Sequence, residues 1–164
     1  MKFTRRGLGL AVLLALAACG HNKFRRYNGP EVTQIQVYKS QRVMLLLHDD
    51  KILKSYKVAL GSDPVGPKRV EGDGKTPEGL YYIDGRNPNS AFHLSLRISY
   101  PDPDDVKAAK ALHQKPGGDI FIHGIGAGDN ETVDWTNGCI AVSDRQMEDV
   151  YAMVKTGTPI FIMP

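Results

Sequence analysis

Cysteine is scarce in this chain, with two residues among 164, Cys19 and Cys139. Two cysteines exclude a framework of several disulfides, so the fold has to rest on a hydrophobic core, which about 130 residues can bury. A single Cys19–Cys139 disulfide stays open for an exported chain. Metal ligands are equally few, because Cys139 and one preceding histidine supply two ligands and no further pair stands at ligand spacing. We therefore expect neither a metal site nor a cofactor.

Acidic residues are absent from the first eighteen positions, where Arg5 and Arg6 precede an apolar stretch at Leu8–Ala18. A basic start and a short apolar run are typical of a secretory signal, and the run is too short to span a bilayer stably. The small residues directly before Cys19 resemble the lipobox of bacterial lipoproteins, in which the cysteine becomes the first residue and its thiol is lipidated. An ordinary signal peptide, with Cys19 incidental, and a twin-arginine signal are the alternatives.

These features predict three segments: a lipoprotein signal peptide at 1–18, a lipidated tether at 19–32 and one domain at 33–164. The signal holds three of the 21 basic residues and none of the 18 acidic ones, so the remaining chain is formally neutral. No basic patch with interleaved aromatic residues occurs, and we expect no nucleic-acid partner. We expect an exported, periplasmic protein with a lipid anchor in a membrane, and Gly20 after Cys19 is compatible with the outer one.

Short apolar runs bounded by turn residues predict a domain rich in strands, about seven in number. Runs at 35–38, 43–47 and 52–60 form a meander, and further strands include 92–99 and a buried one at 119–123. The sequence shows no internal repeat and no low-complexity tract, so these strands belong to one fold.

Capping residues predict two helices. Asp102, followed by Pro103 and two acidic residues, starts a helix that runs to about His113. Ser143, with Gln146 three residues later, forms a capping box at the start of the second helix. Together the elements predict an α+β domain, mainly β, with its two helices packed at one end.

Cys139 and His123 are the candidate catalytic residues. A thiol is a nucleophile as thiolate, and a neighbouring imidazole can take its proton. The glycine-rich stretch between the two residues is long enough to fold back and bring them together. Gly138 has no side chain, so a backbone N–H can approach a reacting carbonyl there. The alternatives are a buried structural Cys139 and a structural His123.

The residues around this pair resemble the signature of the L,D-transpeptidase (YkuD-like) family. That signature is a His-Gly, a loop, then Ser/Thr-His-Gly-Cys and an apolar residue; here it reads Ile122–Gly124 and Thr136–Ile140. Upstream and closing segments of the family are matched by Thr76–Tyr81 and Gly157–Ile160. A wider set resembles the YafK-like branch: Gly66-Pro67-Lys68, Glu71-Gly72-Asp73, Asn87-Pro88, His93–Leu96, Tyr100-Pro101 and Asp134-Trp135.

The resemblance implies a β-sandwich or barrel-like catalytic domain and a role for each motif residue. Cys139 attacks the meso-diaminopimelyl carbonyl of a peptidoglycan stem peptide, expels D-alanine and forms a thioester. His123 moves the proton, and the carbonyl of Gly124 orients the imidazole. The N–H groups of Gly138 and Cys139 hold the oxyanion. The remaining expected substrate-binding residues are Thr136, Asn137, His93 and Tyr100.

Two positions depart from the family pattern. Asn137 stands where histidine is usual, and Ala141 stands where arginine or asparagine is frequent. Altered site walls leave several functions open. The first is a transpeptidase of cell-wall cross-linking and cell shape. The second is a hydrolase on the same scaffold, either an L,D-carboxypeptidase or an amidase releasing a wall-linked lipoprotein. The third is a non-catalytic lipoprotein that binds peptidoglycan.

Overall fold

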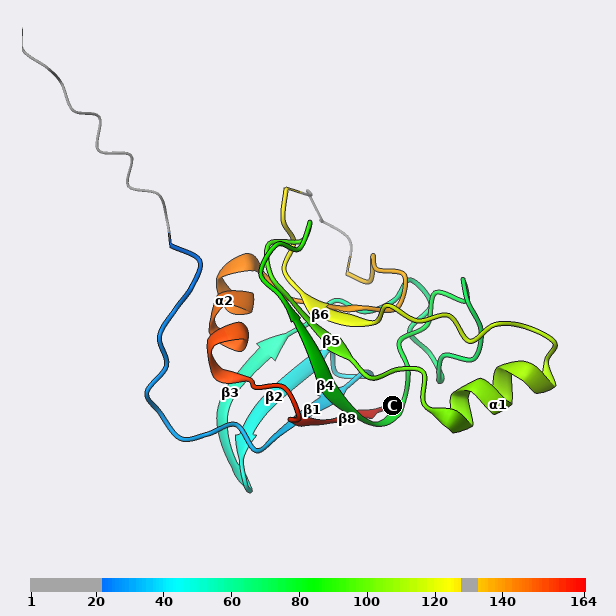
Figure 1. Cartoon of the computed structure of the whole chain (residues 1–164), viewed down its shortest axis with the longest axis horizontal. Coiled ribbons are helices and arrows are strands. Elements are labelled where there is room, and N and C mark those ends of the chain that lie inside the picture. The colour runs from blue at the N-terminus through cyan, green and yellow to red at the C-terminus, as the bar shows by residue number, and fades with distance from the viewer. Residues whose placement is uncertain (1–21, 128–132) are drawn as a thin grey trace, which may run out of the picture.

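The computed structural model describes residues 22–127 and 133–164 (Figure 1). The predicted signal peptide and the predicted lipidation site, Cys19, lie outside the described residues. Within the described part the chain forms eight strands and two helices, in the order β1 (Gln34–Tyr38), β2 (Val43–His48), β3 (Lys51–Lys57), β4 (Gly79–Asn87), β5 (Ser95–Ile98), α1 (Pro103–Ala111), β6 (Phe121–His123), β7 (Ile140–Ala141), α2 (Asp144–Met153) and β8 (Pro159–Met163).

The strands form one curled sheet in the order β3-β2-β1-β8-β4-β5-β6-β7. Neighbours are antiparallel, except that β1 pairs parallel to β8 and β6 parallel to β7. Beyond β3, Ala59 bridges to Ala141 and Gly61 bridges to Thr136. Through these bridges, the segment that follows β3 at one edge of the sheet pairs with residues in and before β7 at the other edge. The predicted barrel-like, mainly β architecture is therefore confirmed.

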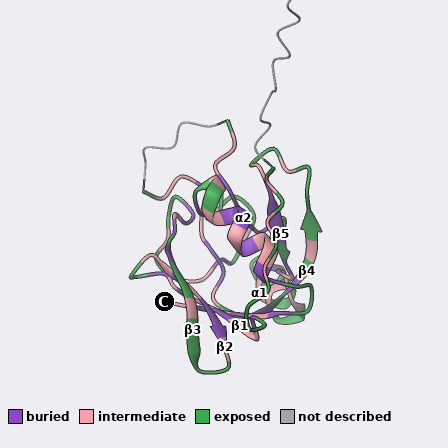
Figure 2. Cartoon of the chain, turned by 90° about the vertical axis from the view of Figure 1, so that its left-hand side faces the viewer, coloured by how far each residue is buried: buried purple, intermediate pink, exposed green. Residues whose placement is uncertain are grey.

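The core lies inside the curl of the sheet, where alternate strand residues point (Figure 2). Ile35 and Val37 of β1 and Ile160 and Ile162 of β8 are buried on this face. The alternation of side chains between the two faces of a strand produces this burial. α2 closes the core with Met147, Val150 and Met153, and its predicted Ser143–Gln146 capping box is present.

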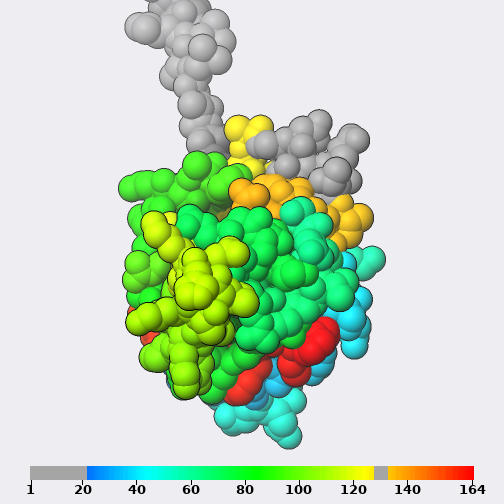
Figure 3. Space-filling model, turned by 90° about the vertical axis from the view of Figure 1, so that its right-hand side faces the viewer, coloured from blue at the N-terminus to red at the C-terminus, as the bar shows by residue number. Residues whose placement is uncertain are grey.

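The sequence predicted both helices at one end of the domain. This prediction is wrong, because the two helices lie on opposite sides of the domain (Figure 1). α1 buries only Ala109 and leaves Val106 exposed, because its sequence offers few apolar residues to the core. It shares a face with the long segment between β3 and β4 (Figure 3). No helix in 22–127 or 133–164 is long and apolar enough to cross a membrane.

One predicted strand is shorter than its apolar pattern suggested. The run 92–99 forms β5 from Ser95 onward, because His93 adopts a positive φ of 72° that a strand cannot continue. Phe92 and His93 therefore belong to a turn before β5. This turn proves to be part of the site described below.

Lys39, directly after β1, anchors the segment between β3 and β4. Its side chain is 2% exposed, and its Nζ donates to the carbonyl oxygens of Gly66 (2.6 Å) and Thr76 (2.9 Å). The third partner is Oε1 of Glu78, 2.8 Å away. Three acceptors for three ammonium hydrogens offset the cost of burying the charge.

Replacing Lys39 with Met should lower the free energy of unfolding by about 3 kcal/mol, since the Glu78 carboxylate and two carbonyls lose their donor. Urea denaturation followed by circular dichroism measures this change. Lys155→Met is the matched control, because Lys155 pairs with Glu31 in an exposed ion pair. That control should leave the midpoint unchanged. Equal losses in both variants would contradict an anchoring role for Lys39.

Candidate active site

The parallel pairing of β6 and β7 brings the two candidate catalytic residues together. Ile122 pairs with Ile140, and His123 pairs with Ala141. Successive side chains of a strand alternate between faces, so Ile122 and Ile140 enter the core and are fully buried. His123, the last residue of β6, and Cys139, directly before β7, consequently lie on the opposite face.

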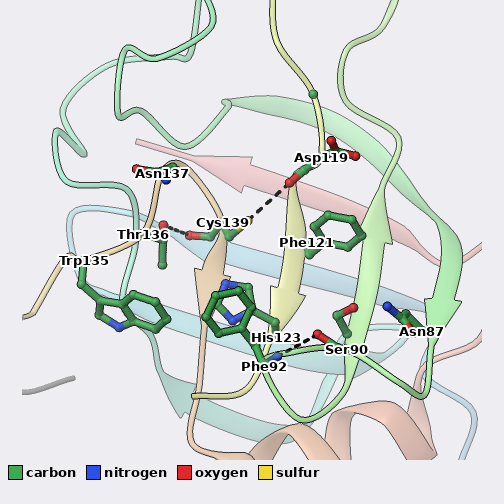
Figure 4. Close-up of a pocket in the computed structure, with 12 residues that line it drawn as sticks. Asn87, Ser90, Phe92, Asp119, Phe121, His123, Trp135, Thr136, Asn137 and Cys139 are labelled. Atoms are coloured by element: carbon green, nitrogen blue, oxygen red, sulfur yellow. Dashed lines mark hydrogen bonds between the residues drawn. The ribbon is translucent and has the colours of Figure 1, made fainter. Parts of the chain in front are cut away.

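Both residues line a cavity of about 420 Å³ (Figure 4). The end of β4, the turn before β5, strands β5 and β6, and the loops that precede β6 and β7 surround it. Its lining includes His123, Cys139, Phe92, Trp135, Asn137 and Asp119. The expected nucleophile and base therefore open into the same space, as acyl transfer requires.

The His123 ring is held in one tautomer by its own neighbour in sequence. Nδ1 lies 2.6 Å from the carbonyl oxygen of Gly124. A carbonyl can only accept, so Nδ1 carries the proton and the neutral ring keeps a lone pair at Nε2. Burial lowers the pKa of His123, and the bond to Gly124 opposes this with a smaller effect. The result is a neutral imidazole with Nε2 available as a base.

Two aromatic side chains fix the plane of this imidazole. The ring of Phe92 packs on His123 with centroids 4.5 Å apart, and Trp135 meets it edge-on at 5.5 Å. Trp135 thus forms a wall of the cavity, beside the imidazole (Figure 4). Phe92 was not singled out by sequence reasoning, because its place in an apolar run is that of an ordinary strand residue.

The thiol of Cys139 is half-buried, and its Sγ donates to the carbonyl oxygen of Asp119 at 3.5 Å. Burial raises the pKa of Cys139 above its ordinary value; the N–H of Phe121 lowers it by a smaller amount. The Asp119 carboxylate also raises this pKa, while Lys68 lowers it. The raised pKa of Cys139 and the lowered pKa of His123 both favour a neutral thiol and a neutral imidazole over an ion pair.

A tight turn presents the nucleophile. The hydroxyl of Thr136 donates to the carbonyl of Cys139 (2.8 Å) and accepts from the N–H of Gly138 (3.1 Å). Gly138 has a φ of 122°, and a Cβ there would lie 2.5 Å from the carbonyl oxygen of Lys75. Only glycine fits this turn. The Gly138 N–H, expected in the oxyanion hole, is thus directed to Thr136 in this structure.

The four expected substrate-binding side chains divide into two pairs. Thr136 and the exposed Asn137 line the cavity. Tyr100 does not: it is buried, donates to the carbonyl of Pro116 and packs edge-on against Tyr81. His93 also lies outside the cavity lining, with Nε2 donating to Glu148 at 3.0 Å. His93 therefore contacts α2 rather than the cavity, and the sequence alone did not indicate this partner.

A sequence profile of the YkuD family, described as the L,D-transpeptidase catalytic domain, matches residues 33–162. The chain belongs to this family. The family predicted from the sequence signature is therefore confirmed. The name of the family indicates transferases.

Individual relatives agree with this assignment. "Putative L,D-transpeptidase YafK" of Escherichia coli (strain K12) is 29% identical over 136 residues, 79% of this chain and 50% of that protein. The helical cell shape determining protein Pgp2 of Campylobacter jejuni is 25% identical with a TM-score of 0.63, over 87% of this chain and 51% of Pgp2. L,D-transpeptidase 1 of Mycobacterium tuberculosis, 14% identical, shares the fold with a TM-score of 0.53 over 82% of this chain and 62% of that one. The chain spans about half the length of YafK and of Pgp2.

The raised pKa of Cys139 leads to a test of the resting site. In a chain carrying Cys19→Ala, iodoacetamide should alkylate Cys139 more slowly at neutral pH than it alkylates free cysteine, because less thiolate is present. The rate should rise through a midpoint above that of free cysteine. Intact mass after timed quenching, across a pH series, gives this midpoint. A midpoint below that of free cysteine would reveal a thiolate–imidazolium pair and contradict the neutral resting state.

Proposed function

We propose that this domain is a cysteine L,D-transpeptidase that acts on peptidoglycan stem peptides through a thioester at meso-diaminopimelate. The observation that carries the proposal is one arrangement. His123 is held by Gly124 with Nε2 unprotonated, and Cys139 lies on the same face of the sheet and in the same cavity. Family membership supplies the reaction class.

The first half of the reaction makes the thioester. Rotation of the Cys139 side chain away from the Asp119 carbonyl turns Sγ toward Nε2 of His123. The imidazole accepts the thiol proton while sulfur attacks the diaminopimelyl carbonyl, and the Cys139 N–H stabilises the oxyanion. The tetrahedral intermediate then breaks its peptide bond. The protonated His123 returns the proton to the nitrogen of D-alanine, which leaves.

The second half transfers the acyl group to an amine. The amine attacks the thioester carbonyl, and Nε2 of His123 takes its surplus proton. Collapse of the intermediate breaks the C–S bond, and the proton returns to sulfur, restoring the neutral Cys139. Proton balance closes over the cycle, so the site consumes no cofactor.

Location follows from the N-terminal pattern. A lipid on Cys19 would keep the exported domain at a membrane on the periplasmic side, within reach of the cell wall. Cross-linking or remodelling of that wall, with effects on cell shape, is the role we propose for such an anchored enzyme.

Hydrolysis of the same thioester is the second candidate function. The exposed Asn137 and Asp119 flank the cavity, so water can reach the acyl group from this rim. Water in place of the amine would make the domain an L,D-carboxypeptidase. If a lipoprotein rather than D-alanine were joined to the diaminopimelyl carbonyl, the same chemistry would release that lipoprotein from the wall.

Mixing the chain with a stem tetrapeptide should add one tripeptide acyl group to the protein mass, and Cys139→Ala should abolish this adduct. His123→Gln should slow acylation by roughly 10²–10⁴-fold, because it removes the base while leaving the thiol in place. Intact-mass kinetics with the tetrapeptide, and with a carbapenem as a second acylating probe, measure both effects. An adduct that persists in Cys139→Ala would rule out Cys139 as nucleophile.

The acylated enzyme also separates the two outcomes. Given purified cell wall, a transpeptidase should produce new cross-links between diaminopimelate residues, seen as dimers after muramidase digestion and mass spectrometry. A hydrolase should release D-alanine or linked protein without such dimers. Absence of acylation, with neither product, would leave only a wall-binding protein and would contradict both functions.

A further inference from the structure

A chain of charged side chains connects the N-terminal segment to the wall of the active site. Arg25 donates Nε to Oε2 of Glu148 (2.9 Å) and Nη1 to Oδ1 of Asp149 (2.6 Å). Glu148, on α2, is 2% exposed, and its other oxygen, Oε1, accepts from Nε2 of His93 at 3.0 Å. The buried carboxylate therefore bridges a residue of the N-terminal segment and a residue of the turn before β5.

Further contacts fasten the same segment, residues 22–27, which we call the strap. Nζ of Lys23 donates to the carbonyl oxygens of Pro88 (2.6 Å) and His93 (3.3 Å). The ring of Phe24 lies 6.4 Å from that of Tyr151 on α2. The strap thus runs beside α2 and holds both α2 and the 88–93 turn (Figure 1).

The 88–93 turn acts directly on the catalytic histidine. Phe92 packs its ring on His123 and accepts the N–H of Gly124 at its carbonyl (3.0 Å). The next residue, His93, has the positive φ that non-glycine residues rarely adopt, a conformation that surrounding contacts must maintain. Its bond to Glu148 is such a contact.

Asp144, the first residue of α2, holds the other side of the histidine. Its Oδ1 accepts the N–H groups of Ile125 (2.7 Å) and Gly126 (2.9 Å), directly after the Gly124 carbonyl that fixes the imidazole. Its Oδ2 lies 3.8 Å from Nδ1 of His93. His93 therefore lies against two of the carboxylates of α2, those of Asp144 and Glu148, and both loops that touch His123 are supported from this helix.

We propose that the strap is a working part of the active site, in which Arg25, Glu148 and His93 are positioning residues that fix the orientation of His123. The inference rests on the proposed function for its kinetic consequences, though the contacts are independent of it. A buried carboxylate that loses one cationic partner must rearrange or take up water, and the turn carrying Phe92 would move with it. Small displacements of a catalytic base are costly to the reaction.

The experiment uses the full-length chain purified in detergent and compares Arg25→Gln, Arg25→Lys and Glu148→Gln. One readout is the low-field proton resonance of the His123 Nδ1–H, which needs no substrate. The other is kcat and KM for the stem tetrapeptide. Glu31→Gln, which removes the exposed ion pair to Lys155 at the far end of α2, is the matched control.

Arg25→Gln should broaden or shift the His123 resonance and lower kcat by about tenfold or more, with KM changed much less. Arg25→Lys should retain more of kcat than Arg25→Gln, because lysine keeps the positive charge. It should not retain all of it, because lysine cannot contact Glu148 and Asp149 with the geometry of a guanidinium. Glu148→Gln should also broaden or shift the His123 resonance. This substitution removes the negative charge and keeps the size of the side chain. Glu31→Gln should match the unmodified chain in both readouts.

An unchanged resonance and kcat in Arg25→Gln and Glu148→Gln, with folding intact by circular dichroism, would overturn the proposal. So would equal losses in Glu31→Gln, because these would indicate general destabilisation. If the unmodified chain turned over no stem peptide while the strap variants still shifted the His123 resonance, the proposed function would fail and the positioning role would stand.

Discussion

The hydrogen bond from Nδ1 of His123 to the carbonyl of Gly124 is the constraint on which the site depends. It fixes the tautomer and leaves Nε2 as the nitrogen that can accept a proton. A backbone carbonyl can orient the ring only if its own peptide is held still. Phe92 on one side and Asp144 on the other supply that restraint, so the loop that contains Gly124 is itself held in place.

Burial acts on both reacting groups in the same direction. It raises the pKa of the Cys139 thiol and lowers that of the His123 imidazole, so each change favours the neutral pair. The N–H of Phe121 favours the thiolate but does not outweigh desolvation. A protonated thiol is less open to alkylation and oxidation than a free thiolate, which fits the proposal of an exported enzyme. In the proposed reaction, transfer of the thiol proton accompanies attack on the bound substrate.

Sequence reasoning was strongest where the information is local. The strand at β1, the capping box of α2 and the motif around Cys139 all reappear in the structure. It was weakest where a side chain meets a partner far along the chain. Glu148 reads as a surface charge of an amphipathic helix, yet its partner Arg25 stands 123 residues earlier. His93 and Tyr100 lie in segments that resemble family motifs, but only the fold determines what their side chains contact.

The contacts of the strap bear on the predicted domain boundary at residue 33, because they tie residues 22–27 to the domain. The family profile also begins at 33, with the first strand of the shared sheet. A sequence profile records the strands of the sheet and the motif residues. The strap acts instead through charged side chains that contact α2, far away in the sequence. Glu148 is buried and needs a cation near it, and the strap places Arg25 there. A segment that reads as a simple tether therefore also completes the electrostatics behind His123, and the physical domain extends toward the proposed anchor.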